Sequence, residues 1–415
     1  MPVETTWTIE FGYSSDGSTV TWTDLTSRVL GFSNDTRVVL GQIGQNSVTI
    51  TLDNNDGALT PGAGGTYSSW DWFERAVHIT ALVDLAPNPT AGGDLFTGLV
   101  DDFDLADDGR NSTVTITAVD IVQILGRATT TATYSAVANL DTDDTIDSVI
   151  ADGFTVPTVG LDPAPALDVE LQGAPAVLHQ WGDGGVTGSP GDIISNNVLP
   201  AGLFTFIGKP RRSSLSFDWR SVVQYLAKGA TTVTFDNDDA NALPFRAIRR
   251  GFNTDELTNA YEQTRIDESG TSSASNTASQ AKYGVRQRSY TTSATSSVYG
   301  DPVAEDWANR FADSTFDVRE LVTSASIVKD RDSSYLDWAH VLGAELLLTP
   351  TDVTFTPTGG TSTTEQCVIV GRRVDASPND SVVTLTLRPA STYMNFTLDS
   401  DAYGVLDQNR LGAFS

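Results

Sequence analysis

The chain has 415 residues and a formal net charge of −28 at pH 7, with 39% hydrophobic and 19% charged residues. This length allows roughly two to four domains. The acidic excess excludes a protein whose main task is to hold nucleic acid, because that requires Lys and Arg against the phosphates. No stretch reaches the roughly 18 apolar residues of a membrane-spanning helix, and the single cysteine, Cys367, excludes an intrachain disulfide.

The charge is unevenly distributed along the chain. Residues 128–208 carry ten acidic residues and no Lys or Arg, whereas residues 209–290 carry 12 basic and nine acidic residues. The segments on either side are strongly acidic again. Two explanations are open: solubility or adaptation to a salty host, and a surface that must not retain DNA or another polyanion.

Residues 1–127 are predicted to form a first tube-like antiparallel β-barrel domain. Short alternating runs recur about every 8–12 residues with turn signals between them. In 95–120 two strands flank the turn sequence DDGRN, and the second strand alternates apolar residues with threonines. The stretch with Pro87, Gly92 and Gly93 is expected to be a loop. The opening sequence MPVETTWTIEFGY lacks the basic and apolar regions of a secretory signal, so we expect none.

Residues 128–235 are predicted to form a small α+β domain. The sequence DTDDTIDSVIADGF, from Asp141, is typical of a helix start, because acidic residues in the first turn stabilise the helix dipole. The sequence GDIISNNVLPAG, from Gly191, is a second short helix candidate. Residues 203–220, LFTFIGKPRRSSLSFDWR, predict a β-hairpin.

Residues 236–395 are predicted to form a second tube-like β-barrel domain, with a helical insertion around 301–345. Within it, DPVAEDWANRFADS, 301–314, places apolar side chains at helical spacing after Asp-Pro. The sequence FDVRELVTSASIV, 316–328, predicts a strand. Residues 396–415 are assigned to a C-terminal extension. The predicted fold class is therefore mainly β, a multi-domain α+β chain with two barrels and smaller α+β domains between or inserted.

Two hairpins resemble each other in sequence. Residues 95–120 and 367–390 each run from an apolar strand through a Gly and a polar turn into V-T-I-T or V-T-L-T. In this comparison Gly98 and Gly371 occupy the same position. Either two hairpins are alike by chance, or one β-barrel fold occurs twice in the chain.

Acidic side chains are the first candidates for chemistry, since paired carboxylates hydrolyse glycosides and bind calcium. They occur in runs at Asp53 and Asp56, at Asp101, Asp102 and Asp104, at Asp107 and Asp108, at Asp141, Asp143 and Asp144, and at Asp236, Asp238 and Asp239. Turn chemistry alone predicts such runs. In DNNDG, placing Gly57 at the sixth position of a calcium loop puts Leu52 at the first and Ala63 at the last, so the ligand pattern fails. We interpret DNNDG as a tight turn at a strand end.

The other reactive residues form no catalytic or metal-binding motif. His78, His179 and His340 are too far apart in sequence for a metal-binding helix motif and are interpreted as structural. Cys367 is expected to be a small buried apolar residue. The sequence contains neither a nucleophile elbow nor a phosphate-binding P-loop. We therefore predict no catalytic, cofactor-binding or metal-ligating residues, no cofactor, and no enzyme activity.

Arginines occur in close pairs. The pairs are Arg211 and Arg212, Arg249 and Arg250, Arg286 and Arg288, and Arg372 and Arg373. They are either solvated surface charges or, in an acidic chain that associates with itself, partners for the carboxylates of a neighbour.

Several segments together are similar to the tail-tip hub proteins, often called minor tail proteins, of long-tailed phages that infect actinobacteria. That family is related to the baseplate hub of contractile phages. The similar segments include TSRVLGF, LDNNDGALTPG, LFTGLVDDFDL, LPFRAIRRGFNTDELTNAYEQTR, DWANRFADSTFDVREL, VIVGRRVDAS and DSDAYGVLDQNRLG. Ser279, Tyr283, Gly284 and Arg286 match the family's Ser-x-x-x-Tyr-Gly-x-Arg stretch. The order agrees across nearly the whole chain.

The resemblance implies a homotrimer in which each chain contributes two barrels, so that three chains present six barrels to a sixfold tail tube. The implied partners are the hexameric distal tail or tail tube protein, the tape measure protein, and distal tip or receptor-binding proteins. Genomic DNA would pass through the ring without specific binding, which suits an acidic wall. The implied location is the tip of the virion tail, after synthesis in the host cytoplasm, with no direct membrane span.

Two other functions remain open. Trp70, Trp72 and Trp181 could bind cell-wall glycan in a tail-tip adhesin, although Trp70 and Trp72 precede an apolar strand and suit a core better. A polysaccharide hydrolase would use one of the acidic pairs.

Overall fold

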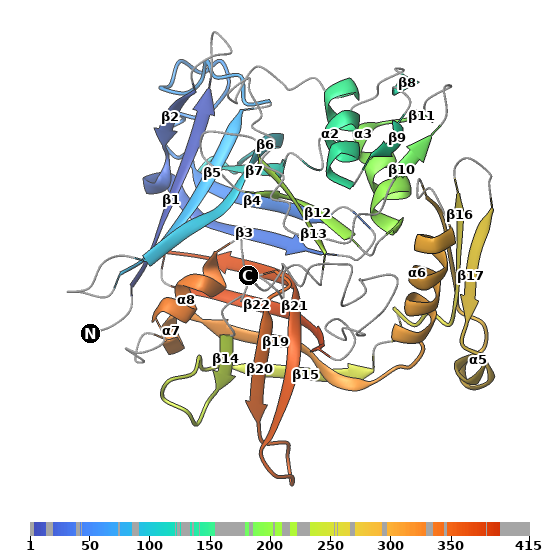
Figure 1. The fold of residues 1–415 in the computed structure, drawn as a ribbon. Coiled ribbons are helices and arrows are strands. Elements are labelled where there is room, and N and C mark those ends of the chain that lie inside the picture. The colour runs from blue at the N-terminus through green and yellow to red at the C-terminus, as the bar shows by residue number, and fades with distance from the viewer. Residues whose placement is uncertain are drawn as a thin grey trace.

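The structure is a computed structural model. It describes residues 4–13, 20–38, 42, 44–73, 75–84, 91–120, 122, 125, 133–134, 137–140, 142–153, 179–181, 186–201, 204–209, 216–221, 233–252, 254, 256–265, 270–292, 297–328, 335–343, 347–378 and 380–390. The chain is mainly β with large antiparallel pairings, which confirms the predicted fold class (Figure 1). The predicted extension, 396–415, lies outside the described residues.

One 13-stranded sheet contains strands from both ends of the chain. The N-terminal strands are β1 (Glu4–Tyr13), β2 (Thr21–Asp24), β3 (Val29–Arg37), β4 (Gln45–Asp53), β5 (Ala76–Asp84), β6 (Ala91–Asp107) and β7 (Ser112–Asp120). The C-terminal strands are β14 (Val233–Asp236), β15 (Ala247–Phe252), β19 (Phe316–Ser324), β20 (Pro350–Phe355), β21 (Thr363–Ala376) and β22 (Ser381–Pro389). Across the sheet the order is β15-β19-β22-β21-β3-β4-β7-β6-β5-β1-β2, and β20 joins β14 to β21.

A five-strand unit occurs twice in this sheet. Strands β3-β4-β7-β6-β5 and β15-β19-β22-β21-β20 have the same spatial order, the same order along the chain, and antiparallel pairing throughout. Of the two explanations for the similar hairpins, the structure therefore supports an internal repeat.

The hairpins of the two units match in detail. Asp107 lies opposite Ser112 at one turn and Ala376 opposite Ser381 at the other. The register slips once in each hairpin, at Asp101 in β6 and at Val370 in β21. Aligning the turns also aligns these two bulges, and it places V-T-I-T of β7 on V-T-L-T of β22.

This alignment corrects the predicted equivalence of two glycines. Gly98 corresponds to Cys367, and Gly371 corresponds to Asp102. Each glycine is required by a different neighbouring group. A Cβ on Gly98 would lie 2.2 Å from the Val119 carbonyl oxygen, whereas one on Gly371 would meet the Thr386 side chain at 3.1 Å.

Alternating apolar residues explain why these strands form one buried face. Val48, Ile50 and Leu52 of β4 are almost completely buried, and so are Val114 and Ile116 of β7. Adjacent strands thus present the same period-two pattern to one core. The largest buried side chains of the C-terminal part include Trp307 and Trp338.

Gly92 and Gly93 are part of β6 rather than of a loop, which corrects that prediction. An added Cβ on Gly92 would lie 2.4 Å from the Ala81 carbonyl oxygen of β5. The glycine permits the backbones of β5 and β6 to approach closely. A sequence pattern does not distinguish a strand glycine in this role from a loop glycine.

Smaller elements lie beside the large sheet (Figure 1). They are η1 (Thr26–Arg28), β8 (Thr133–Tyr134), β9 (Val137–Leu140), α2 (Thr142–Gly153), β10 (His179–Trp181), β11 (Val186–Thr187), α3 (Pro190–Ile193), η2 (Ile194–Val198), η3 (Leu199–Ala201), β12 (Phe204–Lys209), β13 (Ser216–Ser221), β16 (Ala260–Arg265), β17 (Thr271–Ser275), α5 (Thr277–Tyr283), β18 (Gln287–Thr292), α6 (Ser297–Arg310), α7 (Ala325–Val328) and α8 (Tyr335–Leu342). No helix among the described residues is long and apolar enough to cross a membrane.

These elements confirm several local predictions. The helix expected from Asp141 is α2, the short helix expected from Gly191 is α3 with η2, and β12 pairs with β13 as the expected hairpin. The helix expected over 301–314 is α6, which begins earlier, at Ser297, and also ends earlier, at Arg310.

The strand predicted over 316–328 is wrong at its end, because the chain turns into α7 after Ser324. Asp380 explains the change. One of its carboxylate oxygens accepts a hydrogen bond from the Ser326 amide at 3.0 Å, and the other accepts from the Ser326 hydroxyl at 3.0 Å. The distant β21–β22 turn thus fixes this short helix.

The close contact at Gly98 generates the first prediction. Gly98→Ala should lower the free energy of unfolding by about 1–3 kcal/mol, because the added methyl group overpacks the β6–β7 pair. Gly93→Ala is the matched control in the same strand, since its Cβ would meet only the Gly343 Cα at 3.8 Å. Urea unfolding measures both variants. If Gly98→Ala were as stable as Gly93→Ala, the close approach described here would be incorrect.

Candidate functional site

The DNNDG sequence closes the end of β4 against the start of β7. The fully buried Asn54 amide donates to Thr60 Oγ1 at 2.9 Å and to Ser112 Oγ at 3.0 Å. Its carbonyl oxygen accepts from the Leu59 amide at 2.8 Å. Gly57 has φ 68°, the left-handed conformation that a tight turn takes from glycine. The predicted turn is confirmed.

The two carboxylates of this turn are both engaged in holding it. Asp53 accepts from the Asn55 amide at 3.0 Å. Asp56 forms a bidentate pair with Arg28, at 2.9 Å and 2.7 Å. The hydrogen bond from Arg28, together with one from the Ala58 amide, lowers the pKa of Asp56 to about 2. A carboxylate with this pKa cannot donate a proton near neutral pH, so Asp56 does not suit general acid chemistry.

Two of the other four acidic runs also stabilise turns. Asp107 accepts from the Gly109 amide, and Asp108 accepts from the amides of Arg110 and Asn111. These backbone hydrogen bonds lower the pKa of Asp108, that from Asn111 most strongly. Asp236 and Asp239 accept from the amides two residues ahead. Among the described residues, no group of three or more His, Cys, Asp or Glu could hold a metal ion.

His78 is buried and connects three strands. Its Nε2 lies 2.9 Å from Asp94 Oδ1 of β6, and its Nδ1 lies 3.5 Å from Glu10 Oε2 of β1. This geometry supports the structural interpretation. His340 is exposed on α8, and the His179 and Asp141 side chains lie outside the described residues.

Cys367 is buried, as predicted. Burial raises the pKa of its thiol to about 12, so the sulfur stays protonated and is a poor nucleophile at neutral pH.

The tryptophans proposed for glycan binding belong to an aromatic cluster packed on the core. Trp72 is only 5% exposed, and its ring centroid lies 5.0 Å from that of Trp70. The Arg75 guanidinium covers one face of the Trp70 ring, 3.9 Å from the ring centroid. Trp72 therefore offers no open face to a sugar, and Trp70 is partly buried with Arg75 over one face. The Trp181 side chain lies outside the described residues.

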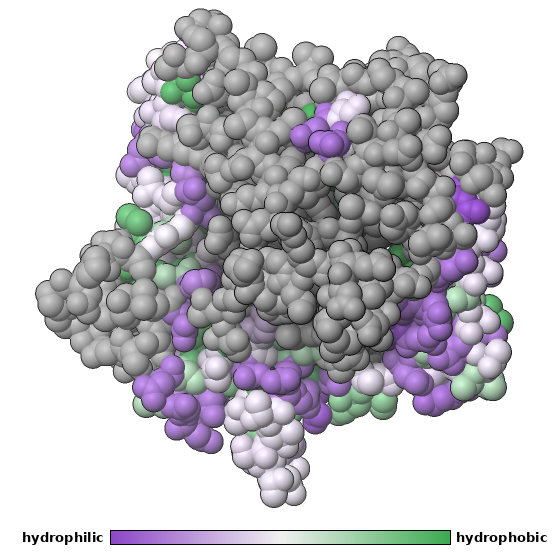
Figure 2. All heavy atoms as spheres, viewed as in Figure 1, coloured by the Kyte–Doolittle hydropathy of each residue, from purple (hydrophilic) through white to green (hydrophobic). Residues whose placement is uncertain are grey.

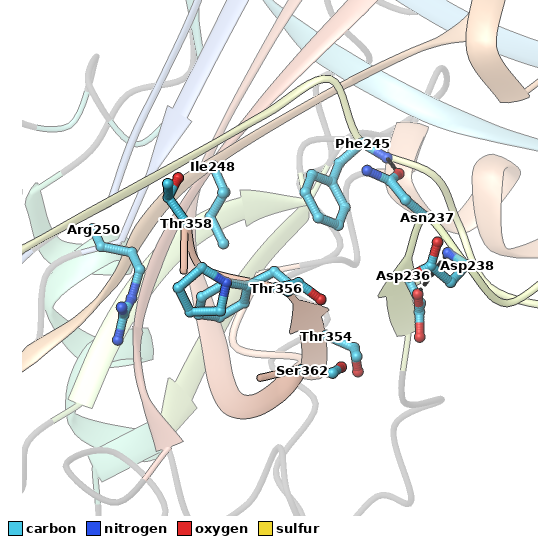
Figure 3. Close-up of a pocket in the computed structure, with 12 residues that line it drawn as sticks. Asp236, Asn237, Asp238, Phe245, Ile248, Arg250, Thr354, Thr356, Thr358 and Ser362 are labelled. Atoms are coloured by element: carbon cyan, nitrogen blue, oxygen red, sulfur yellow. Dashed lines mark hydrogen bonds between the residues drawn. The ribbon is translucent and has the colours of Figure 1, made fainter. Parts of the chain in front are cut away.

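A cavity of about 520 Å³ lies beside β15 (Figure 3). It is lined by Asp236, Asn237, Asp238, Phe245, Ile248, Arg250, Thr354, Phe355, Thr356, Pro357, Thr358 and Ser362. Arg250 donates to Glu365 Oε1 at 2.6 Å. The lining therefore combines four apolar side chains with two carboxylates, one basic group and several amide and hydroxyl groups, and it lacks a Ser, Cys or His nucleophile–base pair.

The cavity opens beside the β20–β21 hairpin, which projects from the body of the molecule (Figure 1). The hairpin tip, residues 356–362, contains only Thr, Pro, Gly and Ser. Figure 2 accordingly draws this projection in pale colours, whereas hydrophilic residues surround its base. The hairpin tip is thus a polar but uncharged protrusion.

The seam between the two repeats is a feature that the sequence reasoning missed. Gly371–Ala376 of β21 pairs with Phe32–Arg37 of β3. Arg372, 2% exposed, donates at 2.9 Å to the Leu342 carbonyl at the end of α8 and also to the Gly343 carbonyl. Arg372 also donates across the seam, to Asn34 Oδ1 at 3.4 Å. Burial lowers the pKa of Arg372 to about 10.

The paired arginines therefore have several different roles. Arg372 is used inside the chain, and Arg373 pairs with Asp375 of its own strand at 3.0 Å. Arg249 is exposed on β15, while Arg250 contacts Glu365. Arg211 and Arg212 lie outside the described residues. Because Arg372 is bonded inside the chain, pairing with a neighbour's carboxylates is excluded as its main role. The structure does not exclude that role for the other arginines.

The chain was compared with solved structures, and its fold is similar to that of one tail protein. The tail protein from Neisseria meningitidis MC58 aligns with a TM-score of 0.55 and 10% identity, covering 96% of this chain and 99% of that chain. The prophage MuSo2 43 kDa tail protein from Shewanella oneidensis aligns with a TM-score of 0.49 and 12% identity, over 94% and 100% of the two chains. The prophage tail protein gp18 from Listeria monocytogenes EGD-e gives 0.44 and 11%, over 93% and 94%.

No protein-family model matches the sequence, and no curated protein matches it. The Neisseria protein therefore shows a shared fold across almost the full length of both chains, at an identity too low to carry residue roles.

The Asn54 contacts generate a second prediction. Asn54→Ala should lower the free energy of unfolding by about 2–3 kcal/mol, because it leaves buried partners unsatisfied. Asn55→Ala is the matched control, since Asn55 is exposed and its side chain makes one hydrogen bond to the Ser112 amide. Thermal unfolding with calcium or with a chelator extends the test. A midpoint that depends on calcium would contradict the metal-free turn.

The two adjacent arginines generate a third prediction. Arg372→Met should destabilise the chain by about 3–5 kcal/mol, because it removes a buried donor and leaves two carbonyl oxygens unpaired. Arg373→Met removes the same charge from an exposed site and should cost less than about 1 kcal/mol. Denaturant unfolding compares them. Equal costs would show that the seam does not depend on Arg372.

Proposed function

We propose that this chain is a structural hub of a phage tail tip. In this role it forms a homotrimeric ring that caps the sixfold tail tube, encloses the DNA exit channel and joins the tube to distal tip proteins. The observation that carries the proposal is the five-strand unit that occurs twice in one continuous sheet. The tail-protein fold supports it.

The repeat gives a physical reason for three copies. A tube of sixfold symmetry offers six equivalent contacts, and a ring of three identical chains offers six when each chain contains two equivalent units. Three chains are therefore enough to match the tube, and six chains are not needed. Closed rotational symmetry also pairs strand edges that would otherwise remain exposed.

The charge of the chain suits a channel for DNA. With a net charge of −28, the protein as a whole repels a polyanion, which would be retained by basic side chains. Genomic DNA is therefore a passing occupant of the ring, without a specific binding site.

The proposed role is structural and not enzymatic. The described acidic side chains at the turns accept backbone hydrogen bonds, and the Cys367 thiol is buried and protonated. Because Trp70 and Trp72 are packed on the core, no described feature favours the glycan-binding alternative.

The proposed partners follow from the position in the tail. They are the hexameric distal tail or tube protein on one side, distal tip or receptor-binding proteins on the other, and the tape measure protein at the channel. The proposed location is the virion tail tip of a long-tailed phage, made in the cytoplasm of an actinobacterial host. The sequence resemblance supports this host, and the structural repeat supports the ring.

The oligomeric mass tests this proposal. Light scattering on the purified chain should give a mass near three times 44.2 kDa at high protein concentration. Antibody labelling of assembled tails should mark one end of the tube. A chain that stays monomeric under all conditions, together with tails that lack a ring of this protein, would exclude the hub. Binding to cell-wall glycan by the monomer would favour an adhesin instead.

A further inference from the structure

Arg75 differs from the other buried arginines of the described chain in its hydrogen bonds. Arg388 donates to a carboxylate and to a backbone carbonyl, and Arg372 donates to two backbone carbonyls and an amide oxygen. Arg75 is 4% exposed and makes one hydrogen bond among the described residues, from Nε to the Asp71 carbonyl at 3.1 Å. Both Nη atoms of Arg75 therefore lack a protein acceptor.

Two aromatic rings hold the Arg75 guanidinium in place. Its Cζ atom lies 3.9 Å from the Trp70 ring centroid and 4.5 Å from the Tyr13 ring centroid. A cation over an aromatic face is attracted by the ring electrons. Tyr13 ends β1, and the pairing of Gly12 with Ala76 brings that end beside the start of β5 (Figure 1). The guanidinium is therefore oriented before any partner binds.

The part of Arg75 that stays available is its outer edge. The two rings lie against the guanidinium, and Nε is already bonded to the Asp71 carbonyl. The Nη atoms are not among the fully enclosed, unbonded side-chain atoms of the described chain, so they reach the surface. An edge with two N–H groups in one plane is the geometry that binds both oxygens of a carboxylate.

No carboxylate of the described chain completes this site. The Asp71 carboxylate is in the same turn, but its Oδ1 accepts from the Phe73 amide at 3.2 Å. Burial lowers the pKa of Arg75 to about 10, because the charge has lost water without gaining an ion pair. The chain has 53 acidic and 25 basic residues, so an arginine that pairs with no described carboxylate is an exception in it. A buried cation is stabilised when an anion completes its bonds.

Exposed aromatic side chains come from the same segments as this site. Phe73 is 60% exposed and Tyr13 is 38% exposed. Tyr, Trp, Phe and Arg are enriched at protein interfaces, and Trp, Tyr and Arg supply much of the binding energy there. The composition around Arg75 therefore fits a protein partner that presents a carboxylate beside apolar side chains.

The internal repeat shows that this site has no counterpart in the second unit. The Val100 amide donates to the Arg75 carbonyl at 2.9 Å, and the Ile369 amide donates to the Thr349 carbonyl at 3.2 Å. Val100 and Ile369 are equivalent in the hairpin alignment, so neutral Thr349 takes the position of Arg75. A contact with a sixfold tube repeats in both units. A site present in only one of them suits a partner that binds once per chain.

We propose that Arg75, held by Trp70 and Tyr13, is a receptor for an Asp or Glu carboxylate of a different tail protein, with Phe73 as the adjacent apolar contact. The carboxylate accepts hydrogen bonds from both Nη atoms. The inference rests on the proposed hub function for the partner being a tail protein. It adds the surface, the number of sites per chain and the chemistry that the partner presents.

Two peptides that differ in one group test the receptor on the full chain. N-acetyl-Asp-Phe amide carries a carboxylate next to an apolar ring, and N-acetyl-Asn-Phe amide lacks the charge. Fluorine NMR of the chain labelled with fluorotryptophan follows the Trp70 signal, which is identified by its loss in Trp70→Phe. We expect the Asp peptide to shift this signal and to bind at least about tenfold more tightly than the Asn peptide, because only the carboxylate forms a charge-assisted bidentate pair.

Variants of the arginine show which group is responsible for the preference. Arg75→Gln should reduce the ratio of the two affinities to about one, and Arg75→Lys should leave a ratio of about three, because lysine keeps the charge without the planar fork. Arg110→Gln removes the same charge from an exposed turn and should leave the ratio unchanged. Equal binding of both peptides by the unchanged chain, or a preference that survives Arg75→Gln, would overturn the receptor.

A second variant avoids the packed arginine, because Arg75→Gln can disturb the folding of the aromatic cluster. Phe73→Ala changes an exposed side chain and should weaken binding of the Asp peptide about three- to tenfold, with an unchanged near-ultraviolet circular dichroism spectrum. Leu30→Ala, at a position 47% exposed on β3, is the control and should have no effect. Undiminished binding by a folded Phe73→Ala chain would contradict the adjacent apolar contact.

Light scattering separates this inference from the hub proposal. Arg75→Gln and Phe73→Ala should keep the oligomeric mass of the unchanged chain, because the receptor binds a different protein. If both variants lost their oligomers, the occupant would be a second copy of this chain, which would overturn the inference and leave the ring in place. A monomeric unchanged chain that still distinguishes the peptides would exclude the hub and support the carboxylate receptor.

Discussion

The pairing of β3 with β21 is the interaction on which the rest of the structure depends. It joins strands from the two ends of the chain, and it turns two five-strand units into one sheet. At its centre the buried Arg372 satisfies carbonyl oxygens at the end of α8 and contacts Asn34 across the seam. A buried guanidinium is expensive unless its donors are bonded. The seam therefore specifies how the two units meet as well as holding them together.

A sheet assembled this way cannot close on itself within the described chain. The seam satisfies one edge of each unit, and the same geometry leaves the other two edges without partners. These edges fit the proposed assembly, in which further copies complete the structure. In that proposal each chain contributes two of six similar units, and the fold shared with a tail protein and the acidic charge of the chain are consistent with it. The local chemistry fits a structural role, because the described carboxylates at the turns stabilise the loops.

The sequence predicted the local structure well and the long-range pairing poorly. Alternation predicted the strand over Val114–Ala118, and spacing correctly rejected DNNDG as a calcium loop in favour of a turn. The V-T-I-T and V-T-L-T strands revealed the repeat, but matching Gly98 to Gly371 gave the wrong register, because each glycine responds to a different neighbouring backbone. Nothing in the local pattern around Arg372 indicates that it is buried. That follows from the carbonyl groups of α8, distant in sequence.

An averaged electron-microscopy image of the assembled chain, viewed along its symmetry axis, tests the central claim most directly. The account predicts a closed ring of three copies whose wall contains six similar units, with the seam within each chain and the joint between chains alternating around the axis. A twofold dimer, in which the same edge of both copies meets, would contradict it. So would an open filament, because head-to-tail contacts that do not close cannot cap a tube.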